Sequence, residues 1–223
     1  MATIRKDLLE DGEVYHIFSR SIAEYKIFSI QADYFRILNA LQFYQFENMP
    51  MKLSEFLEIE NIKNKNARTE ILKRAINKNN IVDIISYCIM PTHIHFILKQ
   101  NMKNGISKFM GDLLNSYTRY FNVRHKRKGP LWESEFKNIL IRSNSQLFNL
   151  TRYIHLNPVT AYFVNRPEEW MFSSYREYIG GIELKICQFE DFFEVDKNEY
   201  IKFVGDRIDY QRELSKIKKL LCE

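Results

Sequence analysis

Hydrophobic and polar positions recur with two different periods along the chain. Residues 13–20, 81–90 and 93–100 are short runs rich in β-branched and aromatic residues, and such runs are typical of strands. Only Pro91 and Thr92 separate the last two runs. The pattern therefore predicts one isolated strand and an antiparallel pair joined by a tight turn.

Three further segments have apolar residues at helical spacing, and they cover residues 30–47, 105–126 and 143–158. The third begins with Ser143, a good helix-capping residue, and runs into Pro158. Because the residue before a proline disfavours the helical conformation, we expect this helix to end before Pro158. Between the second and third helices, the chain turns at residues 129–130 into an extended segment.

The order of strands and helices predicts an α+β fold, with helices packed on an antiparallel sheet. The ferredoxin-like split βαβ arrangement is the commonest way to close that order. Gly180 and Gly181 are the best candidate boundary, which divides the chain into a main domain (residues 1–180) and a charged, mainly helical C-terminal extension (residues 181–223). The polar, basic residues 61–80 are either an exposed helix with loops or an excursion from the main domain.

The composition of the chain indicates which kinds of binding partner it favours. The net charge of +5 and the pI near 8.9 favour a polyanionic partner, and the aromatic content of 14% supplies core residues or base-stacking platforms. Three widely spaced cysteines argue against a disulfide framework or a zinc knuckle. No signal-peptide pattern and no run of 18 apolar residues occurs, so we expect a cytoplasmic protein without a membrane partner.

Two of the five histidines stand one residue apart in the segment CIMPTHIHFILKQ. Because side chains alternate along a strand, His93 and His95 point to the same face, while Ile94 and Phe96 face the core on the other side. Two neutral imidazoles on one face form half of a site for a divalent cation or a phosphate. The alternative is a pair of half-buried histidines with ordinary hydrogen bonds.

A second informative segment is LTRYIHLNPV, residues 150–159. Tyr153 and Asn157 are four residues apart, so a helix presents a phenol and an amide side by side. In the alternative interpretation, Tyr153 is a core aromatic residue and Asn157 caps the helix before Pro158.

A compact basic run, RHKRKG, follows the aromatic helix at residues 124–129. Cations near exposed aromatic rings suit single-stranded nucleic acid, although a charge run is usually a solvated face. The candidate DNA-binding residues are Arg20, Tyr120, Arg124, His125, Lys126, Arg127, Lys128 and Trp132.

Taken in order, four segments of the chain, GEVYHIFSRSI, MPTHIHFIL, YTRYFNVRHKRKGPLWESEFK and YIHLNPVTAYFVNRPEEWMFSSYREY, resemble one family. They are similar to the single-tyrosine transposases of the IS200-like branch of the HUH endonucleases, and within it to the REP-associated tyrosine transposases. The resemblance covers roughly residues 12–180. Thr92 stands where the family commonly has Asn or Glu, and Glu135 stands where relatives mostly have arginine or lysine.

The resemblance implies a metal-dependent enzyme that cuts single-stranded DNA beside hairpins and transfers the strand. His93 and His95 would bind Mg²⁺ or Mn²⁺, Asn157 would complete the metal site, and Tyr153 would form a 5′-phosphotyrosine and leave a 3′-OH. The partner would be single-stranded DNA with a hairpin, and the protein, associated with the nucleoid of a prokaryote, would act as a monomer or as a homodimer.

Two other function classes remain open. The first is a non-catalytic module that binds single-stranded nucleic acid on the same fold. The second is a metallo-hydrolase that uses His93 and His95 with a water nucleophile. Tyr117 and Tyr120 are rival nucleophiles in this tyrosine-rich chain. They follow His93 by only 24 and 27 residues, in a helix that we expect to face the core, so Tyr153 is favoured over both.

Overall fold

The computed structural model describes residues 7–61, 71, 80–182 and 185–221. Its centre is a four-stranded antiparallel sheet with the order β2-β3-β1-β4. The strands are β1 (Val14–Arg20), β2 (Val82–Met90), β3 (His93–Gln100) and β4 (Lys137–Leu140). This is the strand order of a ferredoxin-like sheet, and the predicted α+β class is confirmed.

The predicted antiparallel pair is the hairpin of β2 and β3, and residues 21–28 pack against its turn. The backbone N–H of Ser21 donates to the carbonyl of Thr92 at 2.9 Å. The N–H groups of Ile27 and Phe28 both donate to the carbonyl of Pro91, at 2.9 and 3.1 Å. These bonds hold the start of β3, and therefore His93, against the end of β1.

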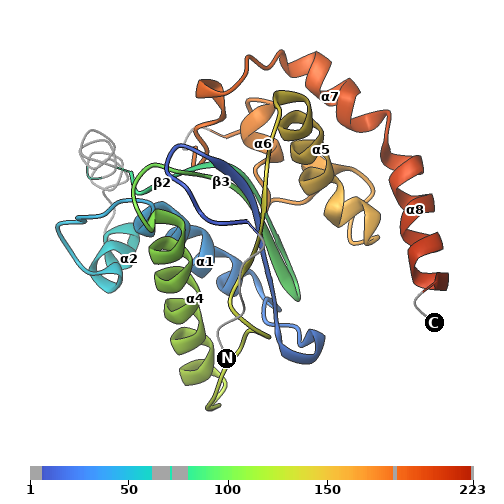
Figure 1. Ribbon diagram of the computed structural model, residues 1–223. Coiled ribbons are helices and arrows are strands. Elements are labelled where there is room, and N and C mark those ends of the chain that lie inside the picture. The colour runs from blue at the N-terminus through green and yellow to red at the C-terminus, as the bar shows by residue number, and fades with distance from the viewer. Residues whose placement is uncertain (1–6, 62–70, 72–79, 183–184, 222–223) are drawn as a thin grey trace.

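Helices cover both faces of the sheet (Figure 1). The helices α1 (Gln31–Tyr44), α2 (Leu53–Asn61) and α4 (Gly105–Arg124) lie on one side. Ile94 and Phe96 of β3 are fully buried on this side, where the ring of Phe96 lies 6.3 Å from that of Phe109 in α4. The expectation that these two residues face the core is confirmed.

The opposite side carries α5 (Asn144–Thr160), α6 (Tyr175–Tyr178), α7 (Lys197–Gly205) and α8 (Ile208–Leu221). Single 3₁₀ turns lie at Ile22–Glu24, Pro167–Glu169 and Phe189–Asp191. As predicted, Ser143 caps α5, since its Oγ accepts a hydrogen bond from the N–H of Gln146 at 3.1 Å.

The expected end of α5 before Pro158 is wrong, because the helix continues to Thr160 with the proline inside it. Proline has no N–H, so the carbonyl of Ile154 loses its usual partner. The side-chain amide of Asn157 reaches that carbonyl at 3.4 Å instead. Backbone bonding then resumes, since the N–H of Ala161 donates to the carbonyl of Asn157 at 3.0 Å.

The C-terminal extension is helical, as expected, and it packs against the main sheet and α5. Ile186, Phe189 and Tyr200 are buried members of the same hydrophobic core as the strands. Residues 61–80, which we expect to form an exposed helix with loops or an excursion, lie almost wholly outside the described residues. Across the part of the chain that is described, no helix is both long and apolar enough to cross a membrane.

Candidate active site

The two histidines of β3 lie beside the end of β1. In the register of the sheet, His93 pairs with Arg20 and His95 pairs with Phe18, so all four side chains share one face. The His95 side chain is buried, and the rings of His93 and His95 stand 5.1 Å apart and almost perpendicular. The sheet therefore presents two imidazoles and one guanidinium together.

Helix α5 crosses this face and brings Tyr153 to the histidines of the same chain. The ring of Tyr153 lies 6.0 Å from that of His95 in an edge-on arrangement, and 37% of the residue remains exposed. Arg20, His93, His95, Tyr153 and Asn157 all line one cleft of about 530 Å³. The structure thus brings together, within one chain, the residues expected to bind the metal and the tyrosine expected to act as nucleophile.

Burial keeps the imidazoles neutral. It lowers the pKa of His93 to about 4, with a further contribution from the positive charge of Arg20. Burial likewise holds the pKa of His95 well below its usual value, assisted by His93, His16 and Arg20. A neutral imidazole keeps a lone pair for a metal ion, so both side chains are ligand-competent at neutral pH.

Burial shifts the pKa of the Tyr153 phenol upwards, whereas it shifts those of the two histidines downwards. The nearby charge of Arg20 acts on the pKa of Tyr153 in the lowering direction. The group is therefore a neutral phenol at neutral pH and must lose its proton before it can act as a strong nucleophile.

The free donor atoms suit a divalent cation. The Nδ1 atom of His93 lies 3.0 Å from Thr92 Oγ1, and Nδ1 of His95 lies 3.0 Å from His16 Nε2. Asn157 donates its amide Nδ2 to the carbonyl of Tyr153 at 3.1 Å. Among the described residues, the two Nε2 atoms and the Asn157 amide oxygen have no hydrogen-bond partner. Together they form a nitrogen–oxygen donor set that suits Mn²⁺, whereas Mg²⁺ prefers oxygen ligands.

Within the described residues, no group of three or more His, Cys, Asp and Glu side chains converges on a possible metal position. A third protein ligand of another residue type would need to line the cleft and offer a hard donor atom. Asn157 meets this condition, because it lines the same cleft and its amide oxygen is a hard donor.

His16 is a site residue that the sequence interpretation missed. It lies in β1 with 8% exposure, directly beside His95, and its ring is also 6.4 Å from that of Tyr153. The available signal was its place two residues before Phe18 and four before Arg20 in a predicted strand, which puts all three on one face. What sequence does not give is the register that sets this face beside His95.

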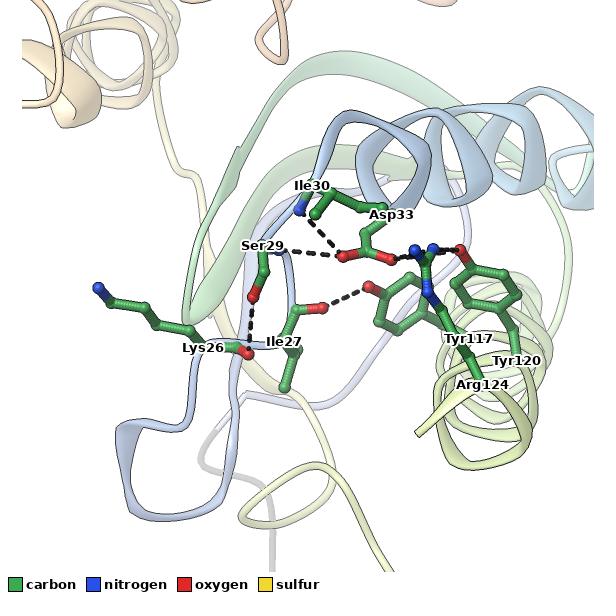
Figure 2. Close-up of polar contacts among 8 residues, drawn as sticks. All are labelled: Lys26, Ile27, Ser29, Ile30, Asp33, Tyr117, Tyr120 and Arg124. Atoms are coloured by element: carbon green, nitrogen blue, oxygen red, sulfur yellow. Dashed lines mark hydrogen bonds and ion pairs between the residues drawn. The ribbon is translucent and has the colours of Figure 1, made fainter. Parts of the chain in front are cut away.

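The other candidate DNA-binding residues lie away from the cleft, apart from Arg20. Figure 2 shows Tyr120 and Arg124 gathered on the carboxylate of Asp33. The Tyr120 hydroxyl donates to Asp33 at 3.2 Å, and the Arg124 guanidinium bonds Asp33 at 3.1 Å and Tyr120 at 2.6 Å. Since Asp33 is buried at the start of α1, this cluster ties α4 to α1.

The remaining residues of the basic run differ in whether their side chains are bonded within the protein or exposed to solvent. His125 stacks on Phe121 with ring centroids 4.1 Å apart, and the Arg127 guanidinium donates to Asn122 and to the Pro130 carbonyl. Lys126 and Lys128 are exposed. This end of α4 therefore offers two cations on its surface.

Trp132 is not a surface platform in this structure. It is 9% exposed, and its indole N–H donates to the carbonyl of Leu114 at 3.3 Å. Its ring packs against Phe28 and Tyr117 in the core. A base cannot stack on it without a rearrangement of this region.

The two rival tyrosines, Tyr117 and Tyr120, are hydrogen-bonded away from the cleft. Tyr117 is 1% exposed and donates its hydroxyl to the carbonyl of Ile27 at 2.6 Å. The hydroxyl of Tyr120 is occupied by Asp33 and Arg124. Both residues lie on α4, on the face of the sheet opposite to the histidines, so neither lines the cleft.

Comparison with known proteins finds a similarity to transposases. The family model described as "Transposase IS200 like" matches residues 59–157, which run from the end of α2 to Asn157. A putative REP-associated tyrosine transposase of Haemophilus influenzae is 28% identical over 103 residues, which are 42% of this chain and 58% of that relative. The alignment thus spans little more than half of the relative.

A solved structure of a REP-associated tyrosine transposase bound to a REP hairpin has the same fold. It aligns with 88% of this chain and 99% of its own, at a TM-score of 0.50 and 15% identity. Residues 59–157 therefore resemble the IS200-like transposases, as the motifs of the sequence indicated. More narrowly, the chain is similar in part of its sequence to a putative REP-associated tyrosine transposase, and it shares the fold of another.

Proposed function

We propose that this protein is a metal-dependent endonuclease and strand transferase that acts on single-stranded DNA beside a hairpin. The observation that carries the proposal is the approach of the Tyr153 ring to within 6.0 Å of the His95 ring, in a cleft that also contains His93, Asn157 and Arg20. IS200-like transposases are typically DNA-nicking enzymes, and the similar solved structure holds a REP hairpin.

Tyr153 is the nucleophile in this mechanism. Its phenolic oxygen attacks the scissile phosphorus, a P–O bond to tyrosine forms, and the bond from phosphorus to the 3′ oxygen breaks. The proton lost by the phenol is balanced by the proton gained by the 3′ oxygen, through solvent in the open cleft. The products are a 5′-phosphotyrosine and a free 3′-OH, and the reverse reaction with another 3′-OH joins strands without ATP.

The cleft residues orient the phosphate and complement its charge. His93 and His95 would hold the metal through their free ring nitrogens, and Asn157 would add its amide oxygen. A bound Mg²⁺ or Mn²⁺ supplies charge neutralisation at the scissile phosphate. Arg20, beside His93 at the end of β1, adds a fixed positive charge where negative charge develops in the transition state.

A labelled-oligonucleotide experiment tests the proposal. Hairpin oligonucleotides with a single-stranded flank carry one dye at the 5′ end and another at the 3′ end. With Mn²⁺, the wild-type chain should form a denaturation-resistant adduct that contains only the 3′ dye, because the 5′ fragment leaves with a free 3′-OH. Tyr153→Phe should bind the same DNA and form no adduct.

Matched variants sharpen the result. Tyr162→Phe changes an exposed tyrosine just beyond α5, and Tyr120→Phe changes the rival on α4, so both should still form the adduct. Binding by the wild type without any adduct over a range of hairpins would instead support the non-catalytic module. Cleavage that persists in Tyr153→Phe would support a metallo-hydrolase with a water nucleophile.

A further inference from the structure

We propose that His16 is the positioning residue of the metal site, which fixes the tautomer and ring orientation of His95 so that its Nε2 atom faces the metal. This inference rests on the proposed function, because it assigns a role in binding the same cation. It adds a third imidazole, from β1, to the two that the sequence motif supplies.

The contact is buried and specific. His16 Nε2 and His95 Nδ1 are 3.0 Å apart, and the two rings stack with centroids 5.2 Å apart and an angle of 18° between their planes. Both side chains are 8% exposed. The sheet sets this geometry, since Phe18 pairs with His95 and the next pair on the same face is His16 with Ile97.

A hydrogen bond between two neutral imidazoles has only two forms. In one, His95 donates from Nδ1 and keeps its lone pair on Nε2. In the other, His16 donates from Nε2, so His95 has its lone pair on Nδ1 and a proton on Nε2. Only the first form leaves His95 with a free Nε2 ligand, and in it His16 carries its own proton on Nδ1.

The two histidines of the motif are supported unequally. His93 Nδ1 faces the hydroxyl of Thr92, which rotates and serves as donor or acceptor alike. His95 faces Nε2 of His16, which accepts a hydrogen bond only in the tautomer that carries the His16 proton on Nδ1. Ligating histidines in proteins commonly donate their second nitrogen to a fixed acceptor, and loss of that acceptor weakens metal binding about 10- to 100-fold. His16 is that acceptor for His95.

His16 acts through His95 and is not itself a ligand. Its Nε2 atom is directed at His95 Nδ1, on the side of that ring away from Nε2. In the part of the chain that the structure describes, His16, His93 and His95 do not form a converging trio of metal donors. His16 therefore supports the metal site through its hydrogen bond to His95, the expected metal ligand.

Mn²⁺ titration of the full chain without DNA is the first test, with His16→Leu and His16→Gln as variants. Leucine fills the volume without an acceptor, so Mn²⁺ binding should weaken about 10- to 100-fold. Glutamine carries an amide oxygen that can accept the His95 proton, so it should restore most of the affinity. A leucine variant that binds Mn²⁺ within about twofold of the wild type, or a wild type that does not bind Mn²⁺, overturns the proposal.

Nitrogen NMR of histidine side chains is the second test, and it needs no metal. In the metal-free wild type, His95 should be protonated on Nδ1, and His16→Leu should shift it towards the Nε2-protonated form. Wild-type His95 protonated on Nε2 contradicts the proposal. If the leucine variant does not fold, this wild-type spectrum and the glutamine variant still decide it.

The two tests separate this inference from the proposed function. Metal affinity and tautomer are measured without DNA, whereas the adduct assay measures the tyrosine chemistry. A wild type that shows the metal and tautomer pattern and forms no adduct would retain the role of His16 and remove the transferase proposal.

Discussion

The hydroxyl of Tyr200 in α7 lies 2.7 Å from Nδ1 of His155 in α5, and both residues are buried. The same hydroxyl donates to Thr151 of α5 at 2.9 Å. His155 also bonds Ser174 through Nε2 at 2.7 Å. Tyr153 stands between Thr151 and His155 in sequence, so the C-terminal extension is bonded directly to the helix that carries the candidate nucleophile.

Removal of the Tyr200 hydroxyl should destabilise the fold. Tyr200→Phe keeps the ring but leaves Nδ1 of His155 without the hydroxyl that it contacts in the interior, while Thr151 keeps its bond to the carbonyl of Phe148. The loss of such a buried partner costs about 1–3 kcal/mol. Chemical denaturation measures the free energy of unfolding. Tyr210→Phe, on the exposed side of α8, should change it by less than about 0.5 kcal/mol. Equal effects of the two substitutions would mean that the buried hydroxyl contributes nothing.

His155 should make the protein sensitive to acid. Burial lowers the pKa of His155 to about 3, whereas a histidine in the unfolded chain has a pKa near 6.5. Between these values the unfolded state binds the extra proton, so stability falls as pH falls from about 6.5 towards 3. A neutral substitute removes this contribution.

The comparison of wild type with His155→Gln isolates that single group. In metal-free buffer between pH 4 and 6, the free energy of unfolding of the wild type should fall more steeply, by up to about 1.4 kcal/mol per pH unit. The other buried histidines titrate in both proteins and cancel in the difference. Parallel curves would show that His155 keeps its usual pKa in the folded state.

Metal removal should abolish strand cleavage without abolishing DNA binding. EDTA should eliminate the covalent adduct, and added Mn²⁺ should restore it. His93→Gln and His95→Gln should each reduce adduct formation on the order of 100-fold or more, since each removes a ligand of the proposed cation. An adduct that forms equally well in EDTA would remove the metal from the mechanism.

Much of the framework was readable from local sequence. The strand and helix periods gave β1, the hairpin and α4, and Ser143 marked the start of α5. These features depend on neighbours a few residues apart, so the chain itself carries the signal. The end of α5 did not follow, because Asn157 supplies from its side chain the bond that Pro158 removes.

The candidate site likewise has residues that could be predicted from local sequence and residues that could not. His93 and His95 share a face by strand geometry alone, whereas His16 joins them through the β1–β3 register, which links residues 79 apart. The surroundings of Trp132 and Tyr120 were equally hidden, since the core that buries one and the Asp33 carboxylate that binds the other come from distant segments. The local sequence pattern predicts which face of a strand or helix a side chain lies on. Contacts with distant segments decide whether that side chain is free to bind a ligand.

The cations that contact DNA should be identifiable from the salt dependence of binding. For single strands, each phosphate contact contributes about 0.7 to the slope of log K against log salt concentration. Arg20 lies in the cleft, so Arg20→Gln should lower the slope by about 0.7 and also slow adduct formation.

The exposed lysines at the end of α4 test a second DNA-binding surface, away from the cleft. The double substitution Lys126→Gln and Lys128→Gln should lower the slope by about 1.4 if both lysines contact phosphates of the DNA. Lys108→Gln is the control, because that lysine is paired with Asp112 at the other end of α4 and should leave the slope unchanged. A slope that falls only for Arg20→Gln would confine the DNA to the cleft, and a slope that falls only for the lysine pair would contradict a phosphate contact by Arg20.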